Sequence, residues 1–275
     1  MTESRDEREG RPADEAKRPD AWARVEYRRL IAWGPRIERE APFLLRMLDQ
    51  APERSVLDVG CGTGEHTAFF AEKGCRAVGL DASAAMIEKA REHETRGHGR
   101  FVEGDVLEAR RVLSDEEPFG MAICLGNMLP HLLEDDAVRV FARNLSDLLL
   151  PGGILVVQLL NYHPVLAEDV RHLPLNFRPR EDGGELVFLR LMKRGRGRRV
   201  LFFPTTLEWH PEEEETPVTL VSTRRVELAA WTDRDLVPIF REAGFAVETK
   251  GDMQGGPFDP RASKDLVLIA RRTSS

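Results

Sequence analysis

The pattern of apolar and polar residues divides the chain into segments of different kinds. Residues 1–20 contain seven acidic and five basic side chains and almost no apolar ones. Such a segment cannot bury enough surface to offset the entropy lost on ordering, so we predict a disordered tail. From Ala21 onward, apolar residues recur at helical spacing, and Gly34-Pro35 predicts a break between two helices.

Short apolar runs then alternate with amphipathic stretches. One amphipathic stretch spans Ala84–His93 behind Ser83, a good N-cap, and another spans Asp135–Leu149 before Leu150-Pro151-Gly152-Gly153. Strands separated by helices predict a mostly parallel sheet in an α/β domain. The apolar runs predict strands at 55–59, 76–80, from 101, 121–125 and 154–160.

Residues 184–230 break this alternation and predict a β-rich insertion. Two charged turns lie within it, Lys193–Arg199 and Glu212–Glu215, and we expect both to be solvated loops whose opposite charges can attract one another. The strand-like runs of the insertion are Glu185–Leu191, Val200–Phe203 and Val218–Leu228.

The alternating pattern returns after the insertion. A helix capped by Thr232 runs to Gly244, and strands are predicted at 245–249 and 265–270. The expected organisation is a single domain over 21–271 that carries the insertion, with a short tail at 272–275.

Composition narrows the class of protein. The chain has 275 residues with a net charge of −7, which argues against a whole-protein nucleic-acid binder. Three cysteines without zinc spacing argue against a disulfide framework or a metal site and favour a reducing, cytoplasmic compartment. No apolar run reaches the length of a membrane span, and no signal peptide is recognisable, so we expect no membrane association.

The strongest motif is VLDVGCGTG at Val56–Gly64. A predicted buried strand runs directly into Gly60, Gly62 and Gly64, and a helix follows. Glycines at such a turn let the backbone bend sharply and approach a ligand closely. The alternative is a tight strand–helix turn that binds nothing.

Carboxylates follow the next two predicted strands. Asp81 ends the second strand, 19 residues after Gly62, where a carboxylate can accept both hydroxyls of a ribose. Asp105, after Gly104, follows the third strand and could accept an adenine amino group. The alternatives are the first residue of the next helix for Asp81 and a plain turn for Gly104-Asp105. Together these positions predict an adenosine-bearing ligand at the carboxyl ends of the strands.

The glycine spacing discriminates between adenosine ligands. A dinucleotide site prefers G-x-G-x-x-G with a pyrophosphate at the helix start, whereas this run is G-x-G-x-G followed by Glu65, which would repel a pyrophosphate. Asp58 inside the first strand could face an ammonium group. The residues favour S-adenosyl-L-methionine over NAD.

Five segments, VLDVGCGTG, VGLDASAAM, EGDVLE, ICLGNMLPHL and LLPGGILVV, together resemble class I S-adenosylmethionine-dependent methyltransferases. The resemblance covers residues 21–271 and is strong up to Tyr162. ICLGNMLPHL and Asn161-Tyr162 are most similar to the glycine/sarcosine N-methyltransferase branch. The resemblance implies an α/β fold with a Rossmann-like, seven-stranded methyltransferase sheet flanked by helices, an N-terminal helical lid and the β-rich insertion.

The resemblance also implies roles for individual residues. Arg36 would bind the cofactor's carboxylate, and Asn127 and His131 would lie at the methyl-transfer centre, with a helix-capping Asn and a surface His as the alternative. Tyr27 and Trp33 would close over the site unless both are core aromatics. No metal is implied. The full set expected to contact S-adenosyl-L-methionine or the product S-adenosyl-L-homocysteine is Tyr27, Trp33, Arg36, Asp58, Gly60, Gly62, Gly64, Asp81, Ala82, Met86, Asp105, Val106, Leu125 and Gly126.

The chain departs from the glycine-type pattern at one position. Those enzymes carry an arginine before Asn-Tyr that clamps the substrate carboxylate, and this chain has Leu160, preceded by Leu159. Leucine cannot make that charge-assisted bond. Either the acceptor is not a small amino acid or a basic residue of the insertion takes the arginine's place. The two leucines favour a less polar acceptor pocket, unless both are core.

We therefore predict methyl transfer to a small-molecule acceptor, at an amine nitrogen, by in-line displacement over about 3–3.5 Å. His131 is the candidate for orienting the amine or accepting its proton. The alternatives are an O- or C-methyltransferase, a tRNA or other macromolecule methyltransferase that uses the arginines of 193–199, a dehydrogenase, and a cofactor-binding protein without activity. The sequence leaves the oligomeric state open.

Overall fold

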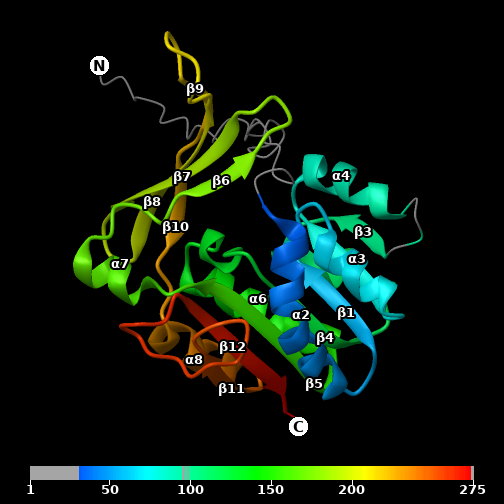
Figure 1. The fold of residues 1–275 in the computed structure, drawn as a ribbon. Helices are drawn as coiled ribbons and strands as arrows, with labels where there is room; N and C mark the ends of the chain where they lie inside the picture. Colours follow the sequence, from blue (N-terminus) through cyan, green and yellow to red (C-terminus); the bar gives the residue numbers. More distant parts are fainter. Residues whose placement is uncertain (1–30, 95–96, 98, 274–275) are drawn as a thin grey trace, which may run out of the picture.

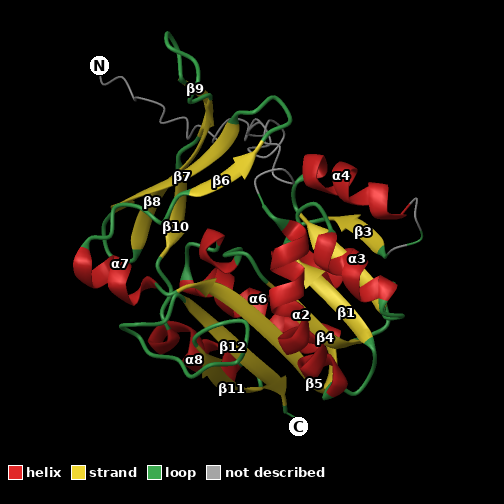
Figure 2. Cartoon of the chain, in the orientation of Figure 1, coloured by secondary structure: helices red, strands yellow, loops and turns green. Residues whose placement is uncertain are grey.

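The computed structural model describes residues 31–94, 97 and 99–273. Sheet A has seven strands in the order β11-β12-β5-β4-β1-β2-β3, and Figures 1 and 2 show it below a second sheet. Strand β12 runs antiparallel to both of its neighbours, β5 and β11. The predicted α/β sheet is confirmed. Its strands are β1 Ser55–Val59, β2 Arg76–Asp81, β3 Arg100–Glu103, β4 Phe119–Cys124, β5 Leu149–Leu160, β11 Phe245–Lys250 and β12 Asp265–Arg272.

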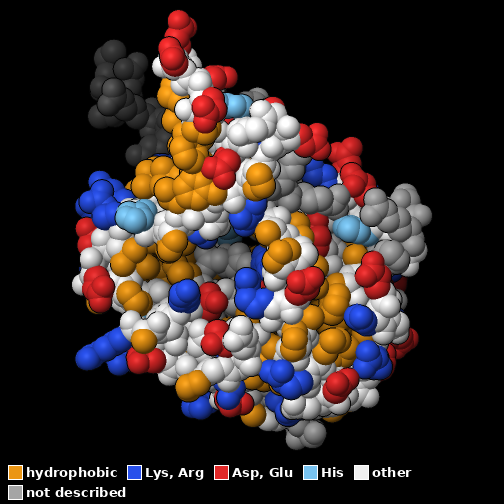
Figure 3. All heavy atoms as spheres, viewed as in Figure 1, with side chains coloured by type: hydrophobic (Ala, Val, Ile, Leu, Met, Phe, Trp, Pro, Cys, Tyr) orange, Lys and Arg blue, Asp and Glu red, His pale blue; other side chains and the backbone are white. Residues whose placement is uncertain are grey.

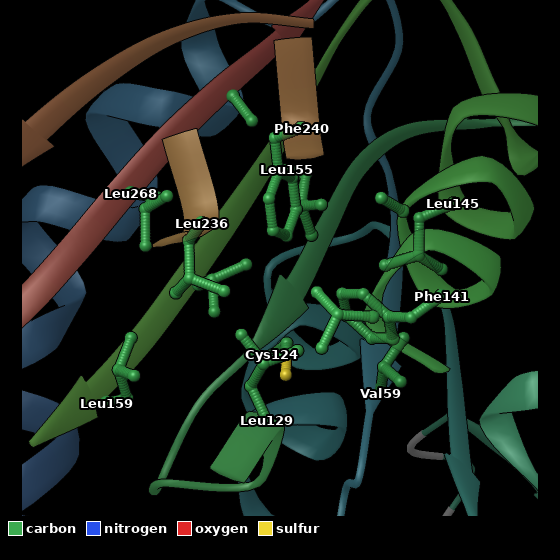
Figure 4. Close-up of a cluster of buried hydrophobic side chains, with 14 of the residues drawn as sticks. Val59, Cys124, Leu129, Phe141, Leu145, Leu155, Leu159, Leu236, Phe240 and Leu268 are labelled. Atoms are coloured by element: carbon green, nitrogen blue, oxygen red, sulfur yellow. The ribbon is translucent and has the colours of Figure 1, made fainter. Parts of the chain in front are cut away.

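Helices cover both faces of sheet A because alternate strand residues are apolar on each side. On one face, Phe43 and Leu48 of α2 and Phe70 of α3 pack against β1, β4 and β5. On the other face, Phe141 of α6 and Phe240 of α8 lie over β5, as Figure 4 shows. This two-sided packing fixes the strand ends at which the site lies. The helices are α2 Trp33–Asp49, α3 Glu65–Glu72, α4 Ala84–Glu94, α5 Ala109–Val112, α6 Asp135–Leu148 and α8 Asp233–Glu242.

Two helix starts follow the predicted capping chemistry. The Ser83 Oγ accepts a hydrogen bond from the Met86 N–H at the start of α4 (3.2 Å). Thr232 forms a capping box with Asp235 at the start of α8. Short polar signals of this kind act within four residues, which explains why the sequence predicts them correctly.

Two local predictions are corrected. Gly34-Pro35 does not separate two helices, because both residues lie in the first turn of α2, where the N–H that proline lacks has no intrahelical acceptor in any case. The part of the predicted helical segment before residue 31 lies outside the described residues, as does the tail 1–20. Strand β5 begins at Leu149 rather than Ile154, because Leu149 pairs with Phe119 across a register shift.

Sheet B is built by the predicted insertion and by residues before it. Its strands are β6 Asn176–Pro179, β7 Glu185–Arg194, β8 Arg199–Trp209, β9 Val218–Thr223 and β10 Val226–Ala229. Strand β6, with the sequence NFRP, has no strand pattern of its own and forms by pairing with β7. The short helix α7 Tyr162–Glu168, capped by the Asn161 side chain, connects sheet A to β6.

The basic turn 193–199 is tied to the helical layer rather than to the acidic turn. Arg198 pairs with Asp135 and Asp235 at the starts of α6 and α8, and its guanidinium lies 4.3 Å from the Trp231 ring centroid. Arg199 pairs with Glu134. These contacts anchor one end of sheet B to the helices that cover sheet A.

Candidate active site

A cavity of about 810 Å³ opens at the carboxyl ends of β1, β2 and β4, the edge at which ligands bind in open α/β sheets. We call it the first cavity. Among residues 31–94, 97 and 99–273, no cluster of side chains is arranged to hold a metal ion, and no helix has the length and apolar character that a membrane crossing requires. The predicted residues that line the cavity are Trp33, Arg36, Asp58, Gly60, Gly62, Asp81, Ala82, Met86, Val106, Leu125, Gly126 and His131.

Asp81 is held at the end of β2 by two backbone groups. Its Oδ2 accepts the Gly62 N–H and its Oδ1 accepts the Ser83 N–H, both at 2.9 Å. The carboxylate therefore links the glycine-rich turn to the start of α4. It presents a fixed negative group to the first cavity, as binding of ribose hydroxyls requires.

The three motif glycines have different structural roles. Gly60, Gly62 and Gly64 all have positive φ, between 57° and 87°, which disfavours any side chain. Gly60 and Gly62 line the first cavity. Gly64 does not line it. A Cβ at Gly64 would lie 2.5 Å from the Phe101 ring. Gly64 thus serves the packing of the turn onto β3 rather than the cavity surface.

Asp58 points from the middle of β1 into the first cavity. Its Oδ2 accepts the Thr67 hydroxyl at 2.9 Å, and burial raises the pKa of the carboxyl group above its ordinary value. A nearby cation would favour the ionised form. Glu65 does not line the first cavity, and its Oε2 accepts the Thr63 hydroxyl at 2.6 Å.

A buried cluster behind the site joins α2 to α3. Glu40 bonds to Arg36 Nε at 3.0 Å and to His66 Nε2 at 3.0 Å. Although burial opposes it, the bond to His66 and the charge of Arg36 hold the pKa of Glu40 below its ordinary value. Trp33 stands edge-on to His66, with ring centroids 5.7 Å apart. Sequence reasoning missed Glu40 and His66, since a single Glu and a single His on separate helices carry no shared spacing.

The end of β3 places Asp105 differently from the prediction. Its Oδ1 accepts the Leu107 N–H at 2.8 Å and caps a short 3₁₀ turn, Val106–Glu108. Asp105 is exposed and does not line the first cavity, whereas Val106 does. Tyr27 lies outside the described residues.

A second cavity, of about 510 Å³, lies between the two sheets, and Figure 3 shows a hollow there with Lys or Arg side chains beside it. Arg36, Gly126 and His131 line both cavities, so the two meet at these residues. Leu160 lines the second cavity and Leu159 is core. Thus one of the two leucines is pocket surface and the other is not.

Asn127 organises the floor of the second cavity. It has a positive φ of 66°, a conformation that asparagine tolerates better than most residues. Its Oδ1 accepts the Leu160 N–H and its Nδ2 donates to the Tyr162 hydroxyl, both at 3.0 Å. Asn127 lines only the second cavity. Burial raises the pKa of Tyr162, so its hydroxyl stays protonated.

A second polar pair continues this floor. The Gln158 Oε1 accepts the Gly126 N–H, and its Nε2 donates to Asp265 Oδ1, both at 2.8 Å. Burial raises the pKa of Asp265. Gln158 and Asp265 come from adjacent strands, β5 and β12, that are far apart in sequence, which is why no local motif indicated them.

His131 ends the 3₁₀ turn Leu129–His131 at the junction of the cavities. Its ring is exposed to the cavities, and removal of bulk water by the surrounding protein, together with the charge of Arg224, lowers its pKa. The imidazole is therefore neutral over a wider pH range than an ordinary histidine. A neutral imidazole at a cavity junction can accept a proton or a hydrogen bond.

Comparison with known proteins agrees with this architecture. Residues 56–153 match the family described as "Methyltransferase domain". A glycine/sarcosine N-methyltransferase of Aphanothece halophytica is 33% identical over 141 residues, which are 50% of this chain and 52% of that protein. The human glycine N-methyltransferase is 31% identical over 138 residues, 46% of this chain and 47% of that protein. The chain thus aligns with about half the length of the curated relatives it matches.

Solved structures are similar over nearly the whole chain. The CcbJ methyltransferase from Streptomyces caelestis has a TM-score of 0.72 and 24% identity, covering 93% of this chain and 97% of that one. CalS10, an amino pentose methyltransferase from Micromonospora echinaspora, has a TM-score of 0.69 and 23% identity, covering 90% and 94%. These likenesses show the fold. The domain match over residues 56–153, the curated relatives and the architecture together support a class I S-adenosylmethionine-dependent methyltransferase.

Proposed function

We propose that the chain transfers a methyl group from S-adenosyl-L-methionine to an amine nitrogen of a small molecule held in the second cavity. The observation that carries the proposal is the shared boundary of the two cavities at Arg36, Gly126 and His131. Reactants bound on either side of this boundary would meet there. The relatives named for N-methylation of glycine and sarcosine support a nitrogen acceptor.

The first cavity has groups that suit each part of the cofactor. Asp81 suits the ribose hydroxyls, and Met86 and Val106 supply apolar surface for the base. Arg36 suits the carboxylate of the cofactor's methionine part. Asp58 suits the ammonium group of the same part, and that ammonium group would be a counter-ion for the buried Asp58 carboxylate. When bound, the cofactor supplies an activated methyl group on a positively charged sulfur.

The chain's own residues would then orient the acceptor and manage its proton. An amine attacks only through its unprotonated nitrogen, and His131 with its lowered pKa is available to take the proton. Asn127 is a positioning residue, since its side chain holds the Tyr162 hydroxyl and the Leu160 backbone at the cavity floor. Met192 and Phe202 of sheet B add apolar surface to the second cavity.

The second cavity favours an acceptor larger than glycine. Its volume of about 510 Å³ falls in the range of about 300–1,000 Å³ that is usual for sites binding larger organic ligands. Leu160 presents an apolar surface where the glycine-type pattern has an arginine. Two of the five cations of the basic turn, Arg198 and Arg199, are engaged with acidic side chains, which leaves fewer of them for the macromolecule alternative.

A labelled-methyl assay tests the proposal. We expect purified protein to methylate members of a series of arylalkylamines and not the matched alcohols and thiols, with glycine and sarcosine as poor acceptors. His131→Asn should lower turnover while S-adenosyl-L-homocysteine affinity, measured by calorimetry, stays unchanged. Transfer to the alcohols alone would contradict the nitrogen assignment, and cofactor binding without transfer to any acceptor would contradict the enzyme assignment.

A further inference from the structure

One face of sheet B lines the second cavity. The lining residues alternate along each strand, as in Phe188, Arg190 and Met192 on β7, because successive side chains point to opposite faces. Strand β6 contributes Arg178 to the same cavity, where it pairs with Leu186, four residues along β7 from Arg190. Two arginines and a phenylalanine therefore stand on the wall opposite the strand ends of sheet A.

Among the described residues that line this cavity, arginines outnumber carboxylates. The described lining residues include five arginines and two carboxylates, Glu40 and Asp265. Glu40 is already bonded to Arg36 and His66, and Asp265 to Gln158. Neither Arg178 nor Arg190 has an acidic partner among the described residues.

Each of the two guanidinium groups donates one hydrogen bond to a backbone carbonyl, but its Nε donor is left unpaired among the described residues. Arg178 Nη1 donates to the Phe177 carbonyl at 2.7 Å, and Arg190 Nη2 donates to the Pro174 carbonyl at 2.8 Å. The Nε of each is buried and has no acceptor in the part of the chain that the structure describes. Burial also lowers the pKa of Arg190, the sign of a cation taken out of water without a counter-ion.

The Arg190 guanidinium lies 5.6 Å from the Phe188 ring centroid. Stacking on an aromatic ring restrains the guanidinium plane while its charge persists. An arginine fixed in this way is prepared for fork-like bonds to a planar or tetrahedral oxyanion. The sheet A wall offers no equivalent, because Leu160 stands there.

We propose that Arg190 forms a subsite for an oxyanion, a carboxylate or a phosphate, carried by the methyl acceptor, and that Arg178 adds positive charge farther along the same wall. The inference rests on the proposed function and names its substrate class: an amine with an apolar body and an acidic group remote from the methylated nitrogen. The acidic group lies against sheet B, the body against Phe188 and Leu160, and the nitrogen at His131.

The test uses probes that need no methyl transfer. Binding of 4-phenylbutyrate, 2-phenylethyl phosphate and neutral 4-phenylbutanol to the full chain with bound S-adenosyl-L-homocysteine is measured by ligand-observed NMR. We expect at least one anion to bind about 10-fold or more tightly than the alcohol, since charge-assisted hydrogen bonds are at stake. The tighter of the two anions identifies the acid group of the natural acceptor.

The double variant Arg178→Gln/Arg190→Gln should lose the preference for the anion and keep its affinity for S-adenosyl-L-homocysteine. Arg194→Gln is the matched control, because Arg194 lies on the same strand but does not line the cavity. If the double variant does not fold, Arg190→Gln alone decides. The subsite is overturned if neither anion binds more tightly than the alcohol, or if the variant keeps the preference. Anion binding without any methyl transfer removes the proposed function and leaves the subsite.

Discussion

The two cavities are built in different ways. The first is shaped by backbone: a turn of positive-φ glycines and a carboxylate, Asp81, fixed by two N–H groups. The second is shaped by side chains from two sheets, and its arginines Arg178 and Arg190 keep unsatisfied donors. A cavity shaped by local backbone suits one fixed ligand. A cavity shaped by side chains can be changed by substitution to fit another ligand, without disturbing the glycine-rich turn.

The largest expected effect is a loss of S-adenosyl-L-homocysteine affinity when Asp81 in the first cavity is replaced. Replacing Asp81 by Ala removes the group assigned to the ribose hydroxyls and the acceptor for the Gly62 and Ser83 N–H groups. We expect S-adenosyl-L-homocysteine affinity to fall about 100-fold or more, on the order of 3 kcal/mol. Calorimetry measures it.

The control for Asp81 is Asp105, the second carboxylate that the sequence assigned to the cofactor. Because Asp105 is exposed and caps a short turn, Asp105→Ala should change the affinity by less than about 3-fold, a few tenths of a kcal/mol. A large loss at Asp105, or none at Asp81, would reverse these two assignments.

A smaller effect is expected on the acceptor side, at Leu160. Leu160→Arg places a long cation in the second cavity, where it takes space and apolar surface from the acceptor, and should reduce turnover of an arylalkylamine about 10-fold or more, equivalent to about 1.4 kcal/mol. S-adenosyl-L-homocysteine affinity should stay near that of the unaltered protein. Leu160→Met keeps the volume and should retain turnover. Equal losses of arylalkylamine turnover and of S-adenosyl-L-homocysteine affinity would mean that the two cavities do not act independently.

The smallest effect concerns the pKa of His131. Arg224 is the second cause of its low pKa, after burial, so Arg224→Gln should raise the pKa toward its ordinary value. The neutral imidazole would then be lost at a higher pH, and the acid limb of the kcat/KM profile should move upward. NMR titration of His131 reads the shift directly, with exposed Arg225→Gln as the control. An unmoved limb would remove His131 from the proton path.

Sheet A and the first cavity could be predicted from the sequence because their signals are local. The Val56–Gly64 turn, the carboxylate of Asp81 and the Thr232 cap each act within a few residues of one strand or helix end. The prediction of a helix break at Gly34-Pro35 was wrong, because glycine and proline break a helix interior but are tolerated in its first turn. Position within the helix, which the pattern did not show, decided the outcome.

The acceptor side could be predicted only in outline. Strand β6 forms through pairing with β7, and Gln158 meets Asp265 across 107 residues of sequence. The departure at Leu160 predicts that any charge recognition of the acceptor comes from another residue, and this stays a prediction. Which arginines line the cavity depends on strand register, and register is a tertiary property.

The alternation of side chains on β7 limits how such a protein can diversify. A substitution at Phe188, Arg190 or Met192 alters the cavity wall and leaves the outer surface alone. A one-residue deletion within the strand would exchange the two faces and bring Leu189 and Leu191 inward in their place. Substitutions inside the strands can therefore change which acceptor the cavity fits, whereas insertions and deletions are tolerated only at the turns.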